Sequence, residues 1–234
     1  MINLIRRRDR DEEASYPSFL DTDTSLWLKG DNPLNTNIRW YDASPNNHVL
    51  NGTATLTDSV LNGQKGYVFN GSSDYFDGGD ILDFGTNNRT MITIGSINSY
   101  NGCFFSKSIA QSLNNRWTLI KINGCISAYV DVPCIYYSSS NSFMNHKIIQ
   151  DRSSNLSYYV NGILKGHNSA SQTDFQTSYK FLVGAYNNTS GTVPPLAGYY
   201  LNGTICEIIF FDRLLTTAET TQLNAYLTLK YGTL

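Results

Sequence analysis

Eight glycine-containing pairs divide the chain into short segments, and seven of them are Asn-Gly. They stand at residues 51–52, 62–63, 70–71, 78–79, 101–102, 123–124, 161–162 and 202–203. Asparagine and glycine both tolerate positive φ, so these pairs suit the tight turns of β-hairpins. Strand-like runs alternate regularly with them along the chain. This rhythm predicts an all-β fold, an antiparallel two-sheet jelly-roll sandwich.

The predicted strands are short and mostly apolar or β-branched. They cover residues 26–29, 38–41, 66–70, 75–77, 91–97, 103–107, 116–122, 125–130, 147–151, 156–160, 181–185 and 205–211. The last of them is apolar on both faces apart from Glu207, which is typical of a strand covered on both sides. Glu207 stands alone there, so we expect it to accept structural hydrogen bonds.

One short helix is predicted after the last strand. Thr216 and Glu219 have the spacing of a capping box at its start, and Gly232 supplies a stop at its end. Between them, the residues at helical spacing that could cover a sheet are Leu223, Tyr226, Leu227 and Lys230.

Residues 1–24 differ from the rest, and we expect an N-terminal arm there, before a single domain over residues 25–234. Within the arm, the block of residues 6–13 has four arginines and four acidic residues and thus no net charge, which argues against DNA binding. Burying its aliphatic side chains in another subunit would offset the entropy of ordering the arm. The expected assembly-anchor residues are Ile2, Leu4, Ile5, Arg6, Arg7, Arg8 and Arg10. The alternative is a solvated terminus.

Net charge and targeting signals limit the partners and the cellular location that we expect for this chain. The net charge is −2, so nothing favours nucleic acid or an anionic membrane as a partner. No apolar run is long enough to span a bilayer. The apolar residues at the N-terminus precede the charged ones, which is the reverse of a secretory signal. We therefore expect the chain to be used without export and its four cysteines to be free thiols.

Four motifs follow one another in the order seen in a known family. They are LWLKGD at residues 26–31, WYDASPNNH at 40–48, YVFNGSSDYF at 67–76 and YYVNG at 158–162. Together with the closing strand and helix, they resemble laminin-G-like jelly-roll domains of the concanavalin-A-like lectin/glucanase superfamily, over about residues 25–232. Pro45 stands where that family usually has glycine. The resemblance implies the fold and says little about function.

The glucanases of that superfamily need two carboxylates about 5 Å apart. They carry them as Glu-x-Asp-x-Glu on one strand, a pattern that this chain lacks; its four glutamates are Glu12, Glu13, Glu207 and Glu219. Its three histidines lie in no catalytic motif, and Gly-x-Ser-x-Gly does not occur. We therefore expect no catalytic activity.

Some relatives in the superfamily hold calcium through carboxylate, amide and carbonyl oxygens. The candidates here are Asp42, Asp74 and Asp212. We favour the alternative, in which Asp42 and Asp74 form Asx turns and Asp212 fixes the turn into the helix. No dense run of ligands and no Cys-x-x-Cys pair is present, so we expect neither calcium nor another metal or cofactor.

A carbohydrate site would use aromatic faces and amide-rich loops. The candidate glycan-binding residues are Trp40, Tyr41, Tyr136, Tyr137, Tyr199 and Tyr200.

Two functions follow. The first is a non-enzymatic structural protein of a large assembly, with a bacteriophage virion as the favoured setting. It would be a capsid-decorating, head-fibre or tail component, attached through the arm to other virion proteins or to its own copies, with an exposed jelly roll that can contact host glycans. The second is a lectin-like carbohydrate-binding module of a bacterial surface or secreted protein. The lack of a signal and of a partner catalytic domain favours the first.

Overall fold

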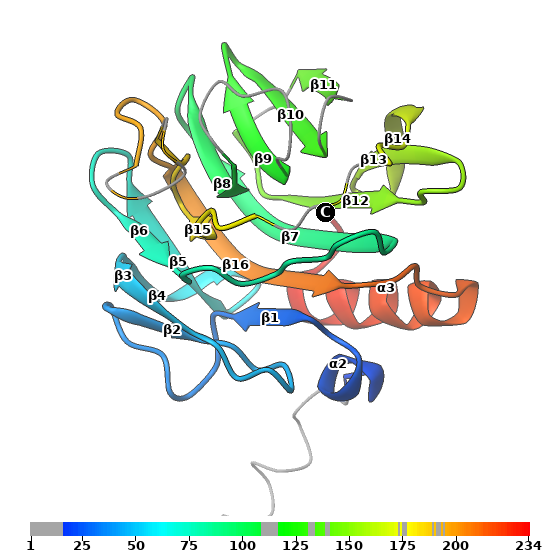
Figure 1. Ribbon diagram of the computed structural model, residues 1–234. Coiled ribbons are helices and arrows are strands. Elements are labelled where there is room, and N and C mark those ends of the chain that lie inside the picture. Colours follow the sequence, from blue (N-terminus) through cyan, green and yellow to red (C-terminus); the bar gives the residue numbers. More distant parts are fainter. Residues whose placement is uncertain are drawn as a thin grey trace, which may run out of the picture.

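The computed structural model describes residues 16–108, 117–130, 134–138, 141–172, 174, 177–188, 190, 193 and 195–234. In this part of the chain two antiparallel sheets pack face to face, as Figure 1 shows. Sheet A contains β1 (Leu26–Lys29), β4 (Thr55–Leu61), β5 (Gln64–Asn70), β7 (Arg89–Ile97), β12 (Met144–Gln150), β13 (Asn155–Val160), β14 (Ile163–Ser169) and β16 (Asn202–Phe211). Sheet B contains β2 (Arg39–Tyr41), β3 (Val49–Thr53), β6 (Tyr75–Asp77), β8 (Gly102–Lys107), β9 (Trp117–Ile122), β10 (Cys125–Val130), β11 (Cys134–Ser138) and β15 (Leu182–Val183). The predicted two-sheet sandwich is confirmed.

The strand order places the longest strand in the middle. Sheet A runs β14-β13-β12-β7-β16-β5-β4, and β1 pairs with the second half of β16 beside β5. Sheet B runs β11-β10-β9-β8-β15-β6-β3-β2. Several neighbours in these orders are distant in the sequence, as expected of a jelly roll.

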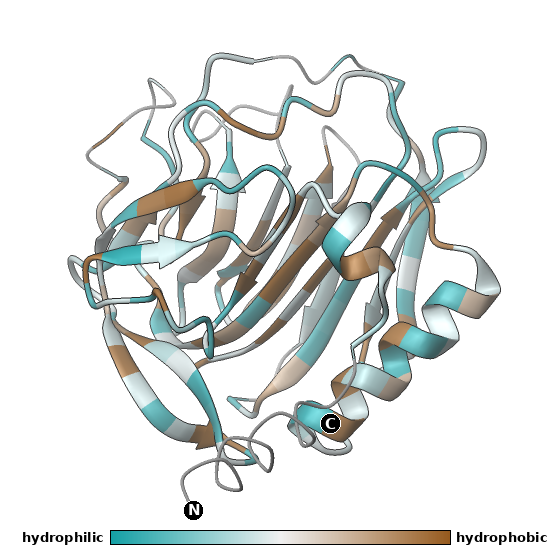
Figure 2. Cartoon of the chain, turned by 90° about the horizontal axis from the view of Figure 1, so that it is seen from below, coloured by the Kyte–Doolittle hydropathy of each residue, from teal (hydrophilic) through white to brown (hydrophobic). Residues whose placement is uncertain are grey.

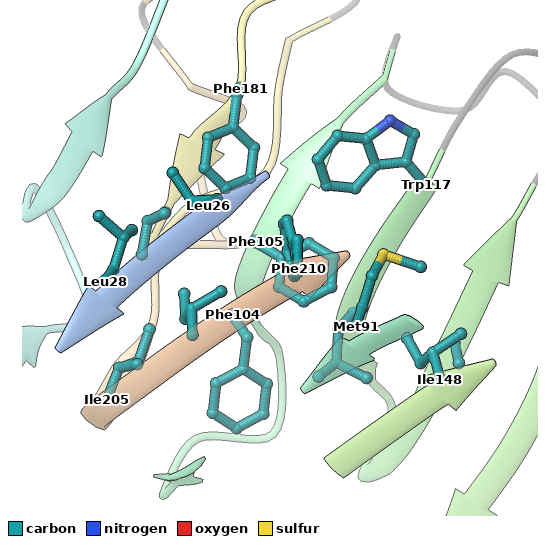
Figure 3. Close-up of a cluster of buried hydrophobic side chains, with 14 of the residues drawn as sticks. Leu26, Leu28, Met91, Phe104, Phe105, Trp117, Ile148, Phe181, Ile205 and Phe210 are labelled. Atoms are coloured by element: carbon teal, nitrogen blue, oxygen red, sulfur yellow. The ribbon is translucent and has the colours of Figure 1, made fainter. Parts of the chain in front are cut away.

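The inner faces of the two sheets form the main core, shown in Figure 3. Its aromatic centre is Trp117, which stacks on Phe181 with ring centroids 5.3 Å apart. Phe210 from β16 meets the same indole edge-on at 5.4 Å. Contacts of this kind add to the free energy of area burial, so the centre of the core depends on residues from both sheets.

The outer face of sheet A is also covered. The helices α3 (Thr217–Tyr231) and α2 (Phe19–Thr22) lie against it, and their buried side chains form a second cluster with Trp27, Ile209 and Phe211. The buried residues of the long helix are Leu223, Tyr226, Leu227, Lys230 and Tyr231, and Figure 2 shows this helix beside the strands. Because β16 packs against sheet B on one side and the helices on the other, it can be apolar on both faces.

Glu207 lies between β16 and α3 and has no exposed surface. Its carboxylate accepts hydrogen bonds from Trp27 Nε1 at 2.6 Å, Tyr226 Oη at 2.9 Å and Tyr231 Oη at 2.5 Å. Lys230 Nζ lies 3.1 Å from it and also pairs with Asp31. The carboxylate therefore ties the first strand, the central strand and the helix together, which confirms its predicted structural role.

The capping box is also confirmed. Thr216 Oγ1 accepts a hydrogen bond from the Glu219 amide, and the Glu219 carboxylate accepts one from the Thr216 amide. Both terminal nitrogens of Arg213 donate hydrogen bonds to the same carboxylate, at 2.6 and 2.9 Å. Hydrogen bonding from Arg213 lowers the pKa of Glu219 to about 2, so the carboxylate stays charged over the pH range in which proteins are usually handled.

Four strands were not predicted: β3, β4, β11 and β14. Much of β4 and β14 is exposed, so these strands lack the apolar alternation that marks a half-buried strand. The Asn51-Gly52 and Asn202-Gly203 pairs lie inside β3 and β16 and are not turns. A Cβ at Gly52 would clash with Tyr75 O, and one at Gly203 would clash with Ser96 O. Here glycine permits a close backbone approach.

The boundary of the domain lies earlier than predicted. Residues 16–24 were assigned to the arm, yet Phe19 and Leu20 are buried in the cluster on the outer face of sheet A. The Tyr16 ring packs edge-on against Trp27, with centroids 5.0 Å apart. The predicted anchor residues, Ile2 to Arg10, lie outside the described residues.

Candidate functional site

The outer face of sheet B carries a group of tyrosines over β8 to β11. Tyr129 on β10 and Tyr136 on β11 meet edge-on, with ring centroids 6.3 Å apart and hydroxyl oxygens 3.4 Å apart. Tyr186 and Tyr199, from the segment between β15 and β16, form a second edge-on pair at 5.8 Å. We call this surface, formed by Tyr129, Tyr136, Tyr186 and Tyr199, the tyrosine face.

The floor of the tyrosine face is apolar. Cys103, Ile120 and Ile122 pack there beneath the rings. Burial raises the pKa of the Cys103 thiol well above its usual value, so this sulfur is a protonated, unreactive thiol. Hydroxyls supply the polar groups: Thr118 Oγ1 and Ser127 Oγ are buried without a hydrogen-bond partner among the described residues.

Exposure differs sharply across the tyrosine face. Tyr136 leaves 61% of its surface open to solvent, whereas Tyr129 and Tyr186 are 8% and 6% exposed. The buried rings of each pair therefore support a more open partner, Tyr136 in one pair and the half-buried Tyr199 in the other. Because each open ring packs against a buried ring, it offers a rigid apolar surface that loses little conformational entropy when a ligand binds.

Amide-rich turns border this surface at the end of the sandwich where β16 begins. Tyr100, 66% exposed, lies beside the Asn123-Gly124 turn, whose amide at Asn123 donates to Asn101 Oδ1 at 2.9 Å. Tyr200 lies at the same end and meets the ring of Tyr75 at 6.2 Å. Burial, and secondarily the neighbouring Tyr75, raises the pKa of Tyr200, so its hydroxyl remains a neutral donor and acceptor.

The structure sorts the six predicted glycan-binding residues into different places. Tyr136 and Tyr199 lie on the tyrosine face, and Tyr200 lies at the adjoining end. Tyr137 lies on the inner side of sheet B and packs against the main core. Lys165 Nζ lies over its ring, 4.7 Å from the centroid. Tyr41 is half-buried on β2, at the far edge of sheet B.

Trp40 requires a correction. It is fully buried, with its ring 4.4 Å from Tyr67 and 5.7 Å from Phe76, and its Nε1 donates to Lys29 O. No sugar can reach that ring from solvent, so Trp40 belongs to the core.

Sequence reasoning missed Tyr75, Tyr100, Tyr129 and Tyr186. Tyr129 alternates with Ala128 and Val130, which face the core, and this period of two could have placed it on the outer face. Tyr100 stands in a run of amides and a hydroxyl, Asn98-Ser99-Tyr100-Asn101, which is typical of an exposed loop. The pairing of Tyr186 with Tyr199 has no local sequence signal.

Each of the three calcium candidates accepts hydrogen bonds within the fold, although Asp212 Oδ1 has no hydrogen-bond partner among the described residues. Asp42 accepts from the Trp27 and Ser44 amides at 2.8 Å each, and from the Ser44 hydroxyl at 2.7 Å. Asp74 accepts from the Asn70 amide at 3.0 Å, and Asp212 from Asn87 Nδ2 at 2.8 Å. The described residues contain no group of three or more His, Cys, Asp or Glu side chains that could hold a metal ion.

His146 is buried and contacts core residues. His146 Nδ1 lies 2.7 Å from the Tyr158 hydroxyl, and its ring is 5.0 Å from Phe104 in the core. Burial lowers the pKa of His146 to about 3, so the imidazole is neutral and closed off from solvent. Glu207, described above, is likewise enclosed by its hydrogen-bond donors.

No helix in the described ranges combines the length and apolar character needed to cross a membrane.

No protein-family model matches this sequence, and no curated protein matches it. Solved structures do resemble the fold. The binding domain of botulinum neurotoxin serotype D superposes with a TM-score of 0.66 at 15% identity, over 90% of this chain and 54% of that one. The ligand binding domain of the same serotype, solved in complex with N-acetylneuraminic acid, gives 0.65 at 15% identity, again over 90% and 54%. The receptor binding domain of a C/D mosaic serotype gives 0.64 at 14% identity, over 90% and 54%.

This chain spans about half the length of these neurotoxin domains. At such identity the likeness is one of fold: a β-sandwich of two antiparallel sheets, shared with domains that bind receptors or ligands.

Proposed function

We propose that the chain is a non-enzymatic binding module that recognises a glycan through the tyrosine face of sheet B. The observation that carries the proposal is the pair of supported, partly open rings, Tyr136 and Tyr199, above an apolar floor. Sugar rings have apolar faces and a rim of hydroxyls, so they match aromatic rings flanked by amides. The turn residues Asn101 and Asn123 supply such amides at the border.

The solved neighbours support this proposal at the level of the fold. They are described as receptor- or ligand-binding domains, and one was solved with N-acetylneuraminic acid. Those descriptions name binding and not catalysis. The preferred glycan of this chain follows from its own surface, which favours a neutral, hydroxyl-rich ligand because the described rings and floor of the tyrosine face carry no charged group.

Alanine at Tyr136 or at Tyr199 is expected to weaken glycan binding about tenfold or more, because truncating an aromatic hot-spot residue costs about 2 kcal/mol or more and about 1.4 kcal/mol is a factor of ten. The measurement is a glycan microarray followed by titration of the strongest hit. Tyr136→Phe should retain most of the affinity, since the ring remains. Tyr41→Ala, at the opposite edge of the sheet, is the matched control and should bind as the wild type does. Absence of any specific hit, or equal affinity in all four variants, would refute the proposal.

We further propose that this module is attached to a large assembly, for which a bacteriophage virion is the favoured setting; a bacterial surface or secreted protein is the alternative. One structural feature supports attachment with the binding surface outward. The described chain begins beside α2, on the outer face of sheet A, whereas the tyrosine face is the outer face of sheet B. Figure 1 shows these two faces on opposite sides of the molecule.

Deleting residues 1–13, which include the anchor residues Ile2 to Arg10, is expected to leave a folded protein that no longer joins its particle. The sandwich begins packing only at Tyr16 among the described residues, so the deletion spares its core. Circular dichroism checks the fold, and quantitative gel analysis of purified particles measures occupancy. Wild-type occupancy of the truncated chain would show that attachment does not need the arm.

A further inference from the structure

A second surface, remote from the tyrosine face, contains two pockets along one seam. The seam lies on the outer face of sheet A, between α3 and the hairpin formed by β12 and β13. One pocket has a volume of about 230 Å³ and includes Lys147, Asp151, Ser157, Leu215 and Thr220 in its lining. The other has a volume of about 240 Å³ and includes Asn145, Asn161, Asn224 and Thr228.

Both pockets are lined by residues of β12 and α3. Asn145, Lys147 and Ile149 alternate along the outer side of β12. Thr220, Asn224 and Thr228 are spaced by four along α3, so they follow one line of the helix surface. Five residues of strand cover about 13 Å, and eight intervals of helix cover about 12 Å. Strand and helix therefore present rows of side chains of matching length to an elongated ligand.

Lys147 is a cation without an acceptor among the described residues. Its side chain is half-buried in the first pocket, with Nζ 4.9 Å from the centre of the Tyr159 ring. In this part of the chain it forms no ion pair, and the carboxylate of Asp151 is instead held by hydrogen bonds from Ser153 and Ser154. Burial lowers the pKa of Lys147, which means that the charged ammonium lacks full solvation. An anionic group of a ligand would supply the missing acceptor.

Asn145 on β12 lines the second pocket. Its backbone is satisfied, because its amide donates to Asn161 Oδ1 at 2.8 Å and its carbonyl accepts from the Asn161 amide at 2.9 Å. Its side-chain Oδ1 is buried and has no partner in the described part of the chain. This oxygen has almost no exposed surface, so a ligand hydroxyl cannot reach it, and Asn145 contributes to the pocket as part of its wall.

We infer that this seam binds an acidic oligosaccharide, with a carboxylate of the ligand seated against Lys147. The remaining amides and hydroxyls suit further sugar hydroxyls, and Leu214 and Leu215 offer an apolar wall for one ring face. This site is independent of the tyrosine face and takes a ligand of different charge.

An acidic peptide is the competing occupant, and the structure favours the sugar. A peptide in extended form binds a sheet by adding a strand at an open edge. Here β12 pairs with β7 and β13, and β13 pairs with β14, so neither strand offers an open edge to the seam. About half of the residues that line each pocket are Ser, Thr or Asn, whose side chains suit sugar hydroxyls better than the apolar side chains of a peptide.

The test is calorimetric titration of the full chain with a galacturonic acid trimer and with the same trimer after reduction of its carboxyl groups. We expect the acidic trimer to bind at least tenfold more tightly than the reduced one, with an affinity that falls as salt is added. Lys147→Gln, which removes the charge and keeps a hydrogen-bond donor, should abolish that difference. Lys165→Gln is the matched control, because Lys165 lies over Tyr137 and outside both pockets.

Three results would overturn the inference. They are equal affinity for the two trimers, unchanged binding of the acidic trimer by Lys147→Gln, and tighter binding of a Gly-Glu repeat peptide than of the acidic trimer. Tyr136→Ala separates this site from the tyrosine face, since it should leave binding of the acidic trimer intact.

Discussion

Replacing Glu207 by alanine is expected to lower the free energy of unfolding by about 3–5 kcal/mol, because it breaks a buried ion pair and leaves a buried cation without its main partner. Lys230 keeps only 7% of its side chain exposed and would retain the partly exposed Asp31 as its ion-pair partner, besides the Tyr226 hydroxyl at 3.0 Å. The Trp27, Tyr226 and Tyr231 donors would lose their shared acceptor at the same time. Chemical denaturation followed by tryptophan fluorescence measures the change.

Two further variants show whether charge and burial cause the loss at Glu207. Glu207→Gln keeps an acceptor at the same place but removes the charge, so a smaller loss is expected. Asp58→Ala removes a carboxylate from an exposed ion pair with Lys65. Because surface ion pairs are weak, that change should cost at most about 1 kcal/mol. A Glu207→Ala protein as stable as the Asp58→Ala protein would show that the network is not essential to the fold.

Truncating Trp117 to alanine is expected to cost about 3–5 kcal/mol, the range for removing a large buried aromatic side chain. The indole contacts Phe105 at 5.7 Å and Phe84 at 5.6 Å, besides its contacts with Phe181 and Phe210. The cavity would open in the aromatic cluster of Figure 3, where both sheets meet and cannot easily collapse. Thermal and urea unfolding measure the loss.

Two control variants show whether the loss at Trp117 depends on the volume of the removed ring and on its buried position. Trp117→Phe retains part of the aromatic volume and should lose less stability than the alanine variant. Tyr100→Ala removes an aromatic ring that is largely exposed. For such a surface substitution we expect a change within about 0.5 kcal/mol. If Tyr100→Ala destabilised the protein as much as Trp117→Ala, the centre of stability would lie at the loop end and not in the core.

Much of the fold could be predicted because it depends on local patterns. The strands Leu26–Lys29, Tyr75–Asp77 and Cys125–Val130 agree with prediction to the residue. The helix agrees as well, because a capping box and a glycine stop mark its ends in the sequence. The exposed strands β4 and β14 were missed because partners in the sheet, and not apolar alternation, hold them in place.

The candidate site was harder to predict, because its residues come together only through the topology of sheet B. Tyr136 and Tyr199 are far apart in the sequence and face the same surface through the order β11-β10-β9-β8. Trp40 shows the opposite case, in which a candidate ring on the predicted strand 38–41 is buried by long-range packing on Tyr67 and Phe76. Aromatic composition indicates that a binding surface can exist, but only burial tells which rings are open.

The proposed glycan binding is tested most directly by a crystal structure of the full chain with the strongest microarray ligand. The proposal predicts a sugar ring stacked on Tyr136 or Tyr199, with its hydroxyls bonded to amides of the turns that hold Asn101 and Asn123. A ligand bound elsewhere on the sandwich, with the tyrosine face empty, would contradict it.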